Sequence, residues 1–171
     1  MSQHQCTIRK VTPQDTPEVL PFITAARHSL FPGLKFKTTI LPEDVSSWIA
    51  SGHFLAAYTT KSPDHLIATI GFVPYDYRFP RLEFHGRKTV EVVRLFVLPE
   101  YRRSGLGNLL FRQSRGTAEG LGVEVMYLHT HPFLPGAVEF WENVGFGVVG
   151  VEEDEGRRTV HMKLELKGEG S

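Results

Sequence analysis

A short turn rich in arginine and glycine is the segment of this sequence whose residue types most clearly suggest chemistry. Arg102-Arg-Ser-Gly-Leu-Gly107 follows a β-branched run that predicts a strand over 89–97, and it precedes an amphipathic helix predicted over 105–120. Such a turn can direct several backbone N–H groups at one anion, and the helix dipole adds to that attraction. Gly105 and Gly107 let the backbone come close to a ligand, because neither carries a Cβ. The sequence therefore predicts a pyrophosphate site in this turn.

The turn differs from the two most familiar phosphate-binding motifs. No Gly-Lys-Ser or Gly-Lys-Thr follows, so it is not a Walker A loop. Leu110 stands where the third glycine of a dinucleotide fingerprint belongs. A plain helix start, with glycines that allow close packing, is the alternative interpretation.

Two longer segments carry a family resemblance. Val90-Glu-Val-Val-Arg-Leu-Phe-Val-Leu-Pro-Glu-Tyr-Arg-Arg-Ser-Gly-Leu-Gly107 resembles the acetyl-CoA loop of the GNAT superfamily of acyl-CoA-dependent N-acyltransferases. Ala137-Val-Glu-Phe-Trp-Glu-Asn-Val-Gly-Phe146 is similar to the second motif of that family. The order of predicted elements also fits, so the resemblance spans nearly the whole chain. It implies an α/β fold with a mixed, mostly antiparallel seven-stranded sheet, about four flanking helices, and fourth and fifth strands that splay apart.

The resemblance also implies a reaction. An N-acetyltransferase moves an acetyl group from acetyl-CoA, its co-substrate, to a primary amine of a small molecule or peptide by direct attack. A non-catalytic acyl-CoA-binding or protein-interaction domain on the same fold is the alternative. The residues that match the family's cofactor contacts are Leu95, Phe96, Val97, Arg102, Arg103, Ser104, Gly105, Leu106, Gly107, Asn108 and Trp141.

Glu91 is the candidate catalytic base. An alkyl ammonium with a pKa near 10 must lose a proton before its nitrogen can attack a thioester, and a carboxylate or histidine usually takes that proton, directly or through water. Glu91 matches a glutamate that acts as base in some members of the family. Alternatively, Glu91 lies at the exposed start of its strand, or it forms a structural ion pair with Arg94 or Arg78.

The candidate acid departs from the family pattern. Many members have a tyrosine where this chain has Trp141, and an indole N–H only donates hydrogen bonds. We therefore expect Trp141 to line the thioester pocket without protonating the leaving thiolate. Tyr127, His129, His131 or water are the other candidates for that role, and a thiolate can also leave without an acid. Leu134 stands where the family often has an asparagine.

The acceptor side is less sharply indicated. His129-Thr-His131 places two imidazoles on one side of a strand predicted over 123–130, either in contact with substrate or in a structural role. No further ligand cluster accompanies them, so no metal site is predicted. The resemblance places 31–34 and 74–88 at the acceptor cleft, although 74–88 could equally form a dimer contact or cover the sheet. The candidate substrate contacts are Phe31, Tyr75, Tyr77, Arg78, His129 and His131.

The remaining pattern predicts a mixed α/β domain. Further strands are predicted over 6–11, 53–59, 66–73, 147–151 and 159–166, and further helices over 42–51 and 135–143. Another helix begins near Thr12, or later if Pro21 interrupts it, and ends before Phe31. In the last strand, Val160 and Met162 alternate with polar residues, which predicts a wet face that includes His161.

Composition sets the remaining expectations. A length of 171 residues predicts one domain, with 167–171 as a frayed tail. Nineteen basic residues balance nineteen acidic ones, so no overall field attracts nucleic acid or an anionic membrane. Cys6 is the only cysteine, which excludes an intramolecular disulfide. Without a secretory signal or a long apolar run, we expect a cytoplasmic protein, either a monomer or a homodimer.

Overall fold

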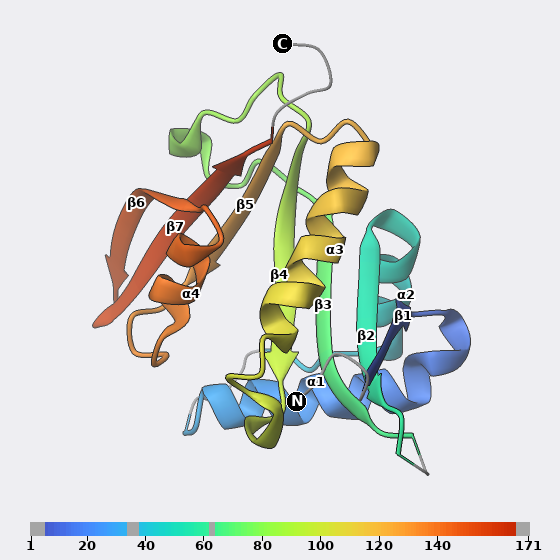
Figure 1. Ribbon diagram of the computed structural model, residues 1–171. Helices are drawn as coiled ribbons and strands as arrows, with labels where there is room; N and C mark the ends of the chain where they lie inside the picture. Colours follow the sequence, from blue (N-terminus) through green and yellow to red (C-terminus); the bar gives the residue numbers. More distant parts are fainter. Residues whose placement is uncertain (1–5, 34–37, 62–63, 167–171) are drawn as a thin grey trace. The chain divides into compact units, whose positions relative to one another are not determined.

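The computed structural model describes residues 6–33, 38–61 and 64–166. Within them, seven strands form one mixed sheet in the order β1-β2-β3-β4-β5-β7-β6, accompanied by four α-helices (Figure 1). Four strand pairs are antiparallel (β1–β2, β2–β3, β5–β7 and β6–β7), whereas β4 and β5 are parallel. The predicted fold class is confirmed. The tail predicted over 167–171 lies outside the described residues.

The chain divides into two compact units. One comprises residues 1–73 and 93–114, and the other comprises 74–92 and 115–171. Both β4 (Thr89–Val97) and α3 (Leu106–Gly120) contribute residues to each unit. That the whole chain is a single domain stays a prediction.

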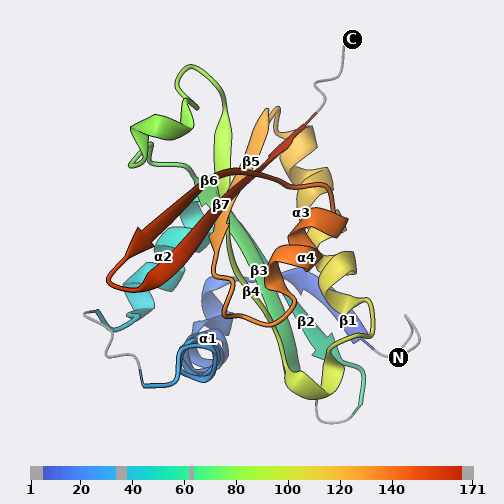
Figure 2. The ribbon, with the colours of Figure 1, turned by 90° about the vertical axis from the view of Figure 1, so that its left-hand side faces the viewer.

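The first unit packs two helices on a meander of strands. It contains β1 (Cys6–Lys10), β2 (His53–Thr59), β3 (Leu66–Pro74), α1 (Thr16–Leu30) and α2 (Pro42–Ser51). Side chains alternate along β2, so Phe54 and Ala56 share a face and join Val19, Ile23 and Val45 of the helices in one buried core. Figure 2 shows α1 and α2 on one side of these strands and the beginning of α3 on the other.

The first helix begins later than a Thr12 cap predicts. Asp15 accepts hydrogen bonds from the Thr12 amide at 2.7 Å and from both terminal nitrogens of Arg9 at 2.8 Å. These bonds hold Pro13–Asp15 in a 3-10 turn, and α1 follows at Thr16. Pro21 lies inside α1 without ending it.

The second unit contains the far end of the sheet. Its elements are the start of β4, β5 (Val125–Thr130), α4 (Ala137–Asn143), β6 (Gly147–Asp154) and β7 (Arg157–Glu165). Glu91 of β4 is paired with Tyr127 of β5, and His129 with His161 of β7, so these four side chains point to one face. Segment 74–88 packs on that face through Tyr75 and Phe84, which pack with Tyr127.

The prediction that His161 lies on a solvent-exposed face of the last strand is wrong. Its side chain is buried because Phe79 of segment 74–88 packs edge-on against it, with ring centroids 4.8 Å apart. An alternating strand pattern alone does not reveal a loop that folds back over its polar side. The opposite face, with Val160, lies towards α4 (Figure 1).

Candidate active site

The turn before α3 presents a row of free backbone donors. Among the described residues, no backbone carbonyl accepts a hydrogen bond from the N–H groups of residues 103–108, and the first helical bond runs from Leu109 N to Gly105 O at 3.0 Å. Arg103 and Gly105 have positive φ angles of 57° and 83°, which turns successive amides towards one side. This turn, followed by a helix of 15 residues, has the geometry of an anion site.

Two of the three polar side chains at the start of this turn, those of Arg102 and Ser104, already make hydrogen bonds within the chain. Arg102 donates from Nε to the Val97 carbonyl at 2.9 Å, and its own amide donates to Pro99 O at 3.2 Å. Ser104 donates its hydroxyl to the Tyr101 carbonyl at 2.6 Å. The free amides therefore begin at residue 103, one residue later than the predicted loop.

A local distortion interrupts β4. Its register with β5 comprises Thr89, Val90 and Glu91, and Arg94 then adopts a φ of +56°. A positive φ in a strand is unusual for any residue except glycine, and it turns the local amides out of the strand ladder. Arg94 is held there by Thr69, whose hydroxyl donates to the Arg94 carbonyl at 2.9 Å, and by Trp48, whose ring lies 4.9 Å from the guanidinium. The limited register agrees with splayed strands.

Glu91 is buried, and each of its two carboxylate oxygens accepts a hydrogen bond. Its side chain is 8% exposed and accepts two bonds from Arg78, at 2.8 and 2.7 Å. His129 Nδ1 lies 3.3 Å from the same Oε1 that accepts from Arg78. Burial raises the pKa of the Glu91 carboxyl, but the bonds from Arg78 and His129 outweigh burial and lower the pKa from 4.5 to about 2. Of the alternatives that the sequence left open, the ion pair with Arg78 is present; the catalytic role of Glu91 stays a prediction.

Three further polar rings surround Glu91 on this face. Tyr127 is fully buried with its hydroxyl 2.6 Å from His161 Nδ1, and burial raises the pKa of Tyr127 above its ordinary value. His131 Nδ1 lies 3.1 Å from the Arg158 carbonyl, and its ring stacks on Phe133. Tyr127 is therefore a poor proton donor to a ligand, whereas His129, whose Nδ1 contacts Glu91, has a side chain that is 39% exposed.

Segment 74–88 contributes most of the predicted acceptor contacts. Tyr75 is buried, and its hydroxyl accepts a bond from the Phe79 amide at 3.2 Å. Tyr77 donates its hydroxyl to the Arg87 carbonyl at 2.9 Å, and Arg78 holds Asp76 as well as Glu91. Phe31, the other predicted contact, follows α1 in the first unit. Contact of these residues with an acceptor stays a prediction.

Trp141 is a buried residue of α4. Its indole packs edge-on against Phe140 and Phe146, with ring centroids 4.9 and 5.3 Å apart. Its expected place beside the thioester stays a prediction.

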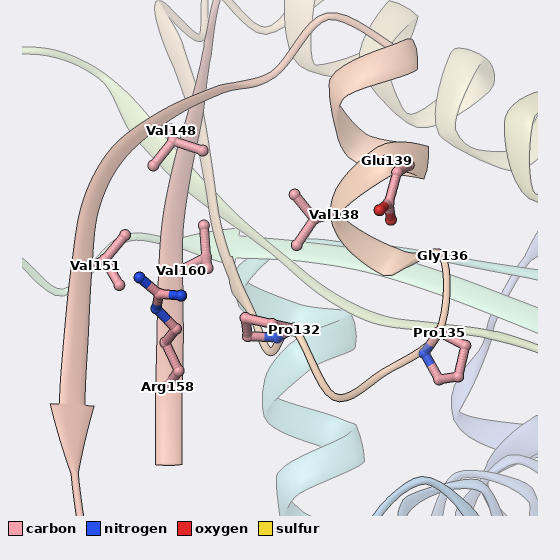
Figure 3. Close-up of a pocket in the computed structure, with 9 residues that line it drawn as sticks. All are labelled: Pro132, Pro135, Gly136, Val138, Glu139, Val148, Val151, Arg158 and Val160. Carbon is pink, nitrogen blue, oxygen red and sulfur yellow. The ribbon is translucent and has the colours of Figure 1, made fainter. Parts of the chain in front are cut away.

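A hollow of about 490 Å³ lies between α4 and the β6–β7 hairpin (Figure 3). Its wall is mostly apolar, with Glu139 and Arg158 as its charged members. It contains none of the residues predicted to bind acetyl-CoA or the acceptor. It lies on the Val160 side of the hairpin, opposite the face that holds Glu91 and His129. The residues that line it are Pro132, Pro135, Gly136, Val138, Glu139, Val148, Val151, Arg158 and Val160.

Two kinds of feature were sought across residues 6–33, 38–61 and 64–166. No cluster of three or more histidine, cysteine, aspartate or glutamate side chains is arranged to hold a metal ion there. Nor is any helix in this part of the chain long and apolar enough to cross a membrane.

Comparison with known proteins identifies the family. The model of the acetyltransferase (GNAT) family matches residues 23–146. This chain belongs to the GNAT acetyltransferase family. A comparison with curated proteins gave no match.

Solved GNAT structures share the fold of this chain. A GNAT acetyltransferase from Staphylococcus aureus Mu50 is 19% identical, with a TM-score of 0.73 over 95% of this chain and 99% of that one. The PaiA N-acetyltransferase of Thermoplasma acidophilum, solved with coenzyme A, is 18% identical, with a TM-score of 0.71 over 94% and 99%. YncA from Salmonella typhimurium, a putative acetyltransferase solved with acetyl-CoA, is 17% identical, with a TM-score of 0.72 over 97% and 96%.

The Glu91 cluster comprises Arg78, Glu91, Tyr127, His129, Glu152 and His161. The sequence did not predict the last two as members. His161 lies on a face predicted to be wet, yet its Nε2 lies 3.4 Å from Oε2 of Glu152, which also pairs with Arg81. The strand alternation that groups His129 with His131 would also have grouped His161 with them, had the pairing of the last strand with 125–130 been known.

Proposed function

We propose that this GNAT protein is an N-acetyltransferase that moves an acetyl group from acetyl-CoA to a primary amine of a small molecule or peptide. The observation that carries the proposal is the row of free N–H groups at residues 103–108. A pyrophosphate carries several acceptor oxygens and negative charge, and such a row meets both requirements at a helix N-terminus. The CoA and acetyl-CoA complexes of the similar proteins support the same ligand.

The proposed binding site uses the backbone more than the side chains. The amides of Arg103, Ser104 and Gly105 lead into those of the first helical turn, and Gly105 and Gly107 keep Cβ atoms away from the ligand. The Arg103 guanidinium supplies charge nearby. Along β4, the backbone of Leu95–Val97 would pair with the pantetheine arm, and an amide near Arg94, where φ is +56°, would supply a hydrogen bond to the thioester oxygen.

Acetyl-CoA supplies an activated acyl group as a thioester. The protein must provide three things: a base that removes a proton from the acceptor ammonium, a donor for the oxyanion, and a site that orients the amine. The amine nitrogen then bonds to the carbonyl carbon, and the C–S bond breaks to release the thiolate. With Trp141 in place of the family's tyrosine, the departing sulfur takes its proton from water.

The experiment is a transfer assay with acetyl-CoA labelled in the acetyl group. The purified protein is incubated with panels of amines and peptides, and stable label in the acceptor is counted. Transfer to any primary amine supports the proposal. Tight CoA binding without transfer to any member of broad panels would instead indicate the non-catalytic acyl-CoA-binding alternative.

A further inference from the structure

The carboxylate of Glu91 is poorly suited to take a proton itself. It is buried, its two oxygens accept both bonds of the Arg78 guanidinium, and its pKa is lowered to about 2. A general base is most effective when its pKa lies near the working pH, and Brønsted behaviour makes a much weaker base correspondingly slow. A proton acceptor with better access is needed on the same face.

His129 has the contact and the exposure that this role requires. Its Nδ1 lies 3.3 Å from Glu91 Oε1, and because an ionised carboxylate only accepts, this contact favours the tautomer with hydrogen on Nδ1. The remaining nitrogen, Nε2, then holds the free lone pair. The contact with the carboxylate therefore favours the tautomer in which Nε2 is basic. The His129 side chain is 39% exposed, whereas that of Glu91 is 8% exposed.

The backbone places His129 where the two central strands part. The register of β4 with β5 ends at Glu91 and Tyr127, and His129 is the next residue of β5 on the same face. His129 therefore lies just beyond the last paired residues, Glu91 and Tyr127.

The neighbouring histidines do not offer the same arrangement. His161 is buried, and its Nδ1 faces the Tyr127 hydroxyl. His131 faces the Arg158 carbonyl, a neutral acceptor that stabilises an imidazolium less than a carboxylate does. Burial lowers the pKa of both rings.

We propose that His129 is the catalytic base of the proposed acetyl transfer, and that Glu91 and Arg78 are positioning residues that hold its tautomer and orientation. Nε2 takes a proton from the acceptor ammonium, and the imidazolium passes it to water. The freed nitrogen bonds to the acetyl carbon while the C–S bond breaks, and its second proton leaves as the thiolate is protonated. The overall change converts an ammonium and acetyl-CoA into the amide, free CoA thiol and one proton.

Charged and titratable groups from several elements face His129. Glu91 of β4 favours the imidazolium, and Arg78 of segment 74–88 offsets part of that attraction. The rings of His131 on β5 and His161 on β7 lie 6.1 and 6.3 Å away, and their protonated forms repel it. Asp76, Arg81 and Glu152 complete the set through their pairs with Arg78 and His161.

The test, which rests on the proposed function, compares kcat across pH for H129Q, E91Q and their double variant. We expect H129Q to lower kcat by roughly 10²–10⁴-fold at neutral pH, with unchanged CoA affinity and partial recovery at high pH, where the amine is already free. E91Q retains an acidic limb, because His129 is still present as the base. The double variant should be no slower than H129Q, because Glu91 acts only through His129. H65Q, at an exposed histidine outside the site, is the control and should match wild type.

The opposite pattern would overturn the assignment. If H129Q kept the wild-type acidic limb while E91Q lost it and was the slower enzyme, Glu91 would itself be the base. Failure of the proposed function is distinguishable, because it leaves no transfer in wild type. The ¹⁵N spectrum of the histidines then still tests the arrangement: hydrogen on Nδ1 of His129 in wild type, lost in E91Q, supports it, and hydrogen on Nε2 in wild type refutes it.

Discussion

Arg78 and Glu91 form a two-bond ion pair, with Nη1 of the guanidinium 2.8 Å from Oε2 and Nη2 2.7 Å from Oε1. Arg78 lies in segment 74–88 and Glu91 in β4, so the pair joins the segment to the strand. The Arg78 guanidinium also lies 4.8 Å from the Phe79 ring, so it is packed as well as paired. One interaction therefore anchors the covering segment and orients the carboxylate that faces His129.

This pair should make the free energy of unfolding depend on pH in the acidic range. The pKa of Glu91 is lowered from 4.5 to about 2 on folding, so its contribution is complete above pH 4.5 and is lost as the pH falls towards 2. At 1.4 kcal/mol per pKa unit, the contribution is at most about 3.5 kcal/mol. We expect the unfolding free energy of E91Q to fall less than that of wild type between these pH values, as measured by urea unfolding.

Removal of Arg78, the partner of Glu91, should destabilise the protein most at neutral pH. R78M leaves a buried carboxylate without its main donor, and burial then raises the pKa of Glu91. Because the Arg78 side chain is 37% exposed, water compensates in part, and we expect a loss of about 1–3 kcal/mol at neutral pH that becomes smaller on acidification. R81M changes an exposed arginine of the same segment and serves as the control. An R78M protein as stable as R81M would show that the pair contributes nothing.

A second pH effect should arise from His161. Burial is the main reason why its pKa lies below the ordinary 6.5, so the folded state binds a proton less readily than the unfolded state does. Its contribution is complete above pH 6.5 and is lost as the pH falls below that value. We expect H161Q, which keeps a partner for the Tyr127 hydroxyl, to lose less stability than wild type between about pH 7.5 and about pH 5.5. Equal losses in the two proteins, measured by thermal unfolding, would exclude this role for His161.

Much of the fold was predictable because the strongest patterns are local. The β-branched run over 89–97 and the helix over 42–51 match β4 and α2 residue for residue. Helix starts were less accurate: Thr12 does cap a helical turn that begins at Pro13, but this is a 3-10 turn, and α1 itself begins at Thr16. Nothing in the strand alternation reports that segment 74–88 folds over His161, since that contact joins residues far apart in the sequence.

Many residues of the candidate site could be predicted from the sequence, but the contacts between them could not. The phosphate turn is contiguous, so its residues identify it. The Glu91 cluster joins side chains from β4, β5, β6, β7 and segment 74–88, and only the strand register brings Tyr127 and His129 beside Glu91. The sequence offered Arg78 and Arg94 as alternative partners of Glu91, and the positive φ at Arg94 accompanies a contact with Trp48 instead.

Trp141 should act through packing and not through proton transfer. An indole does not titrate near neutrality, so W141F should keep the alkaline limb of the wild-type rate profile. W141Y should bind CoA about as well as wild type, because most of the aromatic contact with Phe146 is retained. Kinetics across pH and CoA titration measure both effects. An inactive W141F that still binds CoA would show that the indole N–H takes part in catalysis.

Substitutions at Gly105 and Gly116 should have different effects, one on CoA binding and the other on the stability of α3. Gly105 has a φ of +83° at the free amides, whereas Gly116 is exposed within α3, and a Cβ would meet no atom within 4 Å at either position. G105V should lower CoA affinity sharply, because valine disfavours that φ and adds bulk beside the amides. G105N adds a side chain but tolerates a positive φ, so it should retain more affinity than G105V. G116A should bind CoA as wild type does and gain about 0.5–1 kcal/mol of stability, since alanine favours the helix. Calorimetric titration with CoA and urea unfolding measure the two quantities separately. A folded G105V protein with wild-type CoA affinity would remove the 103–108 turn from the binding site.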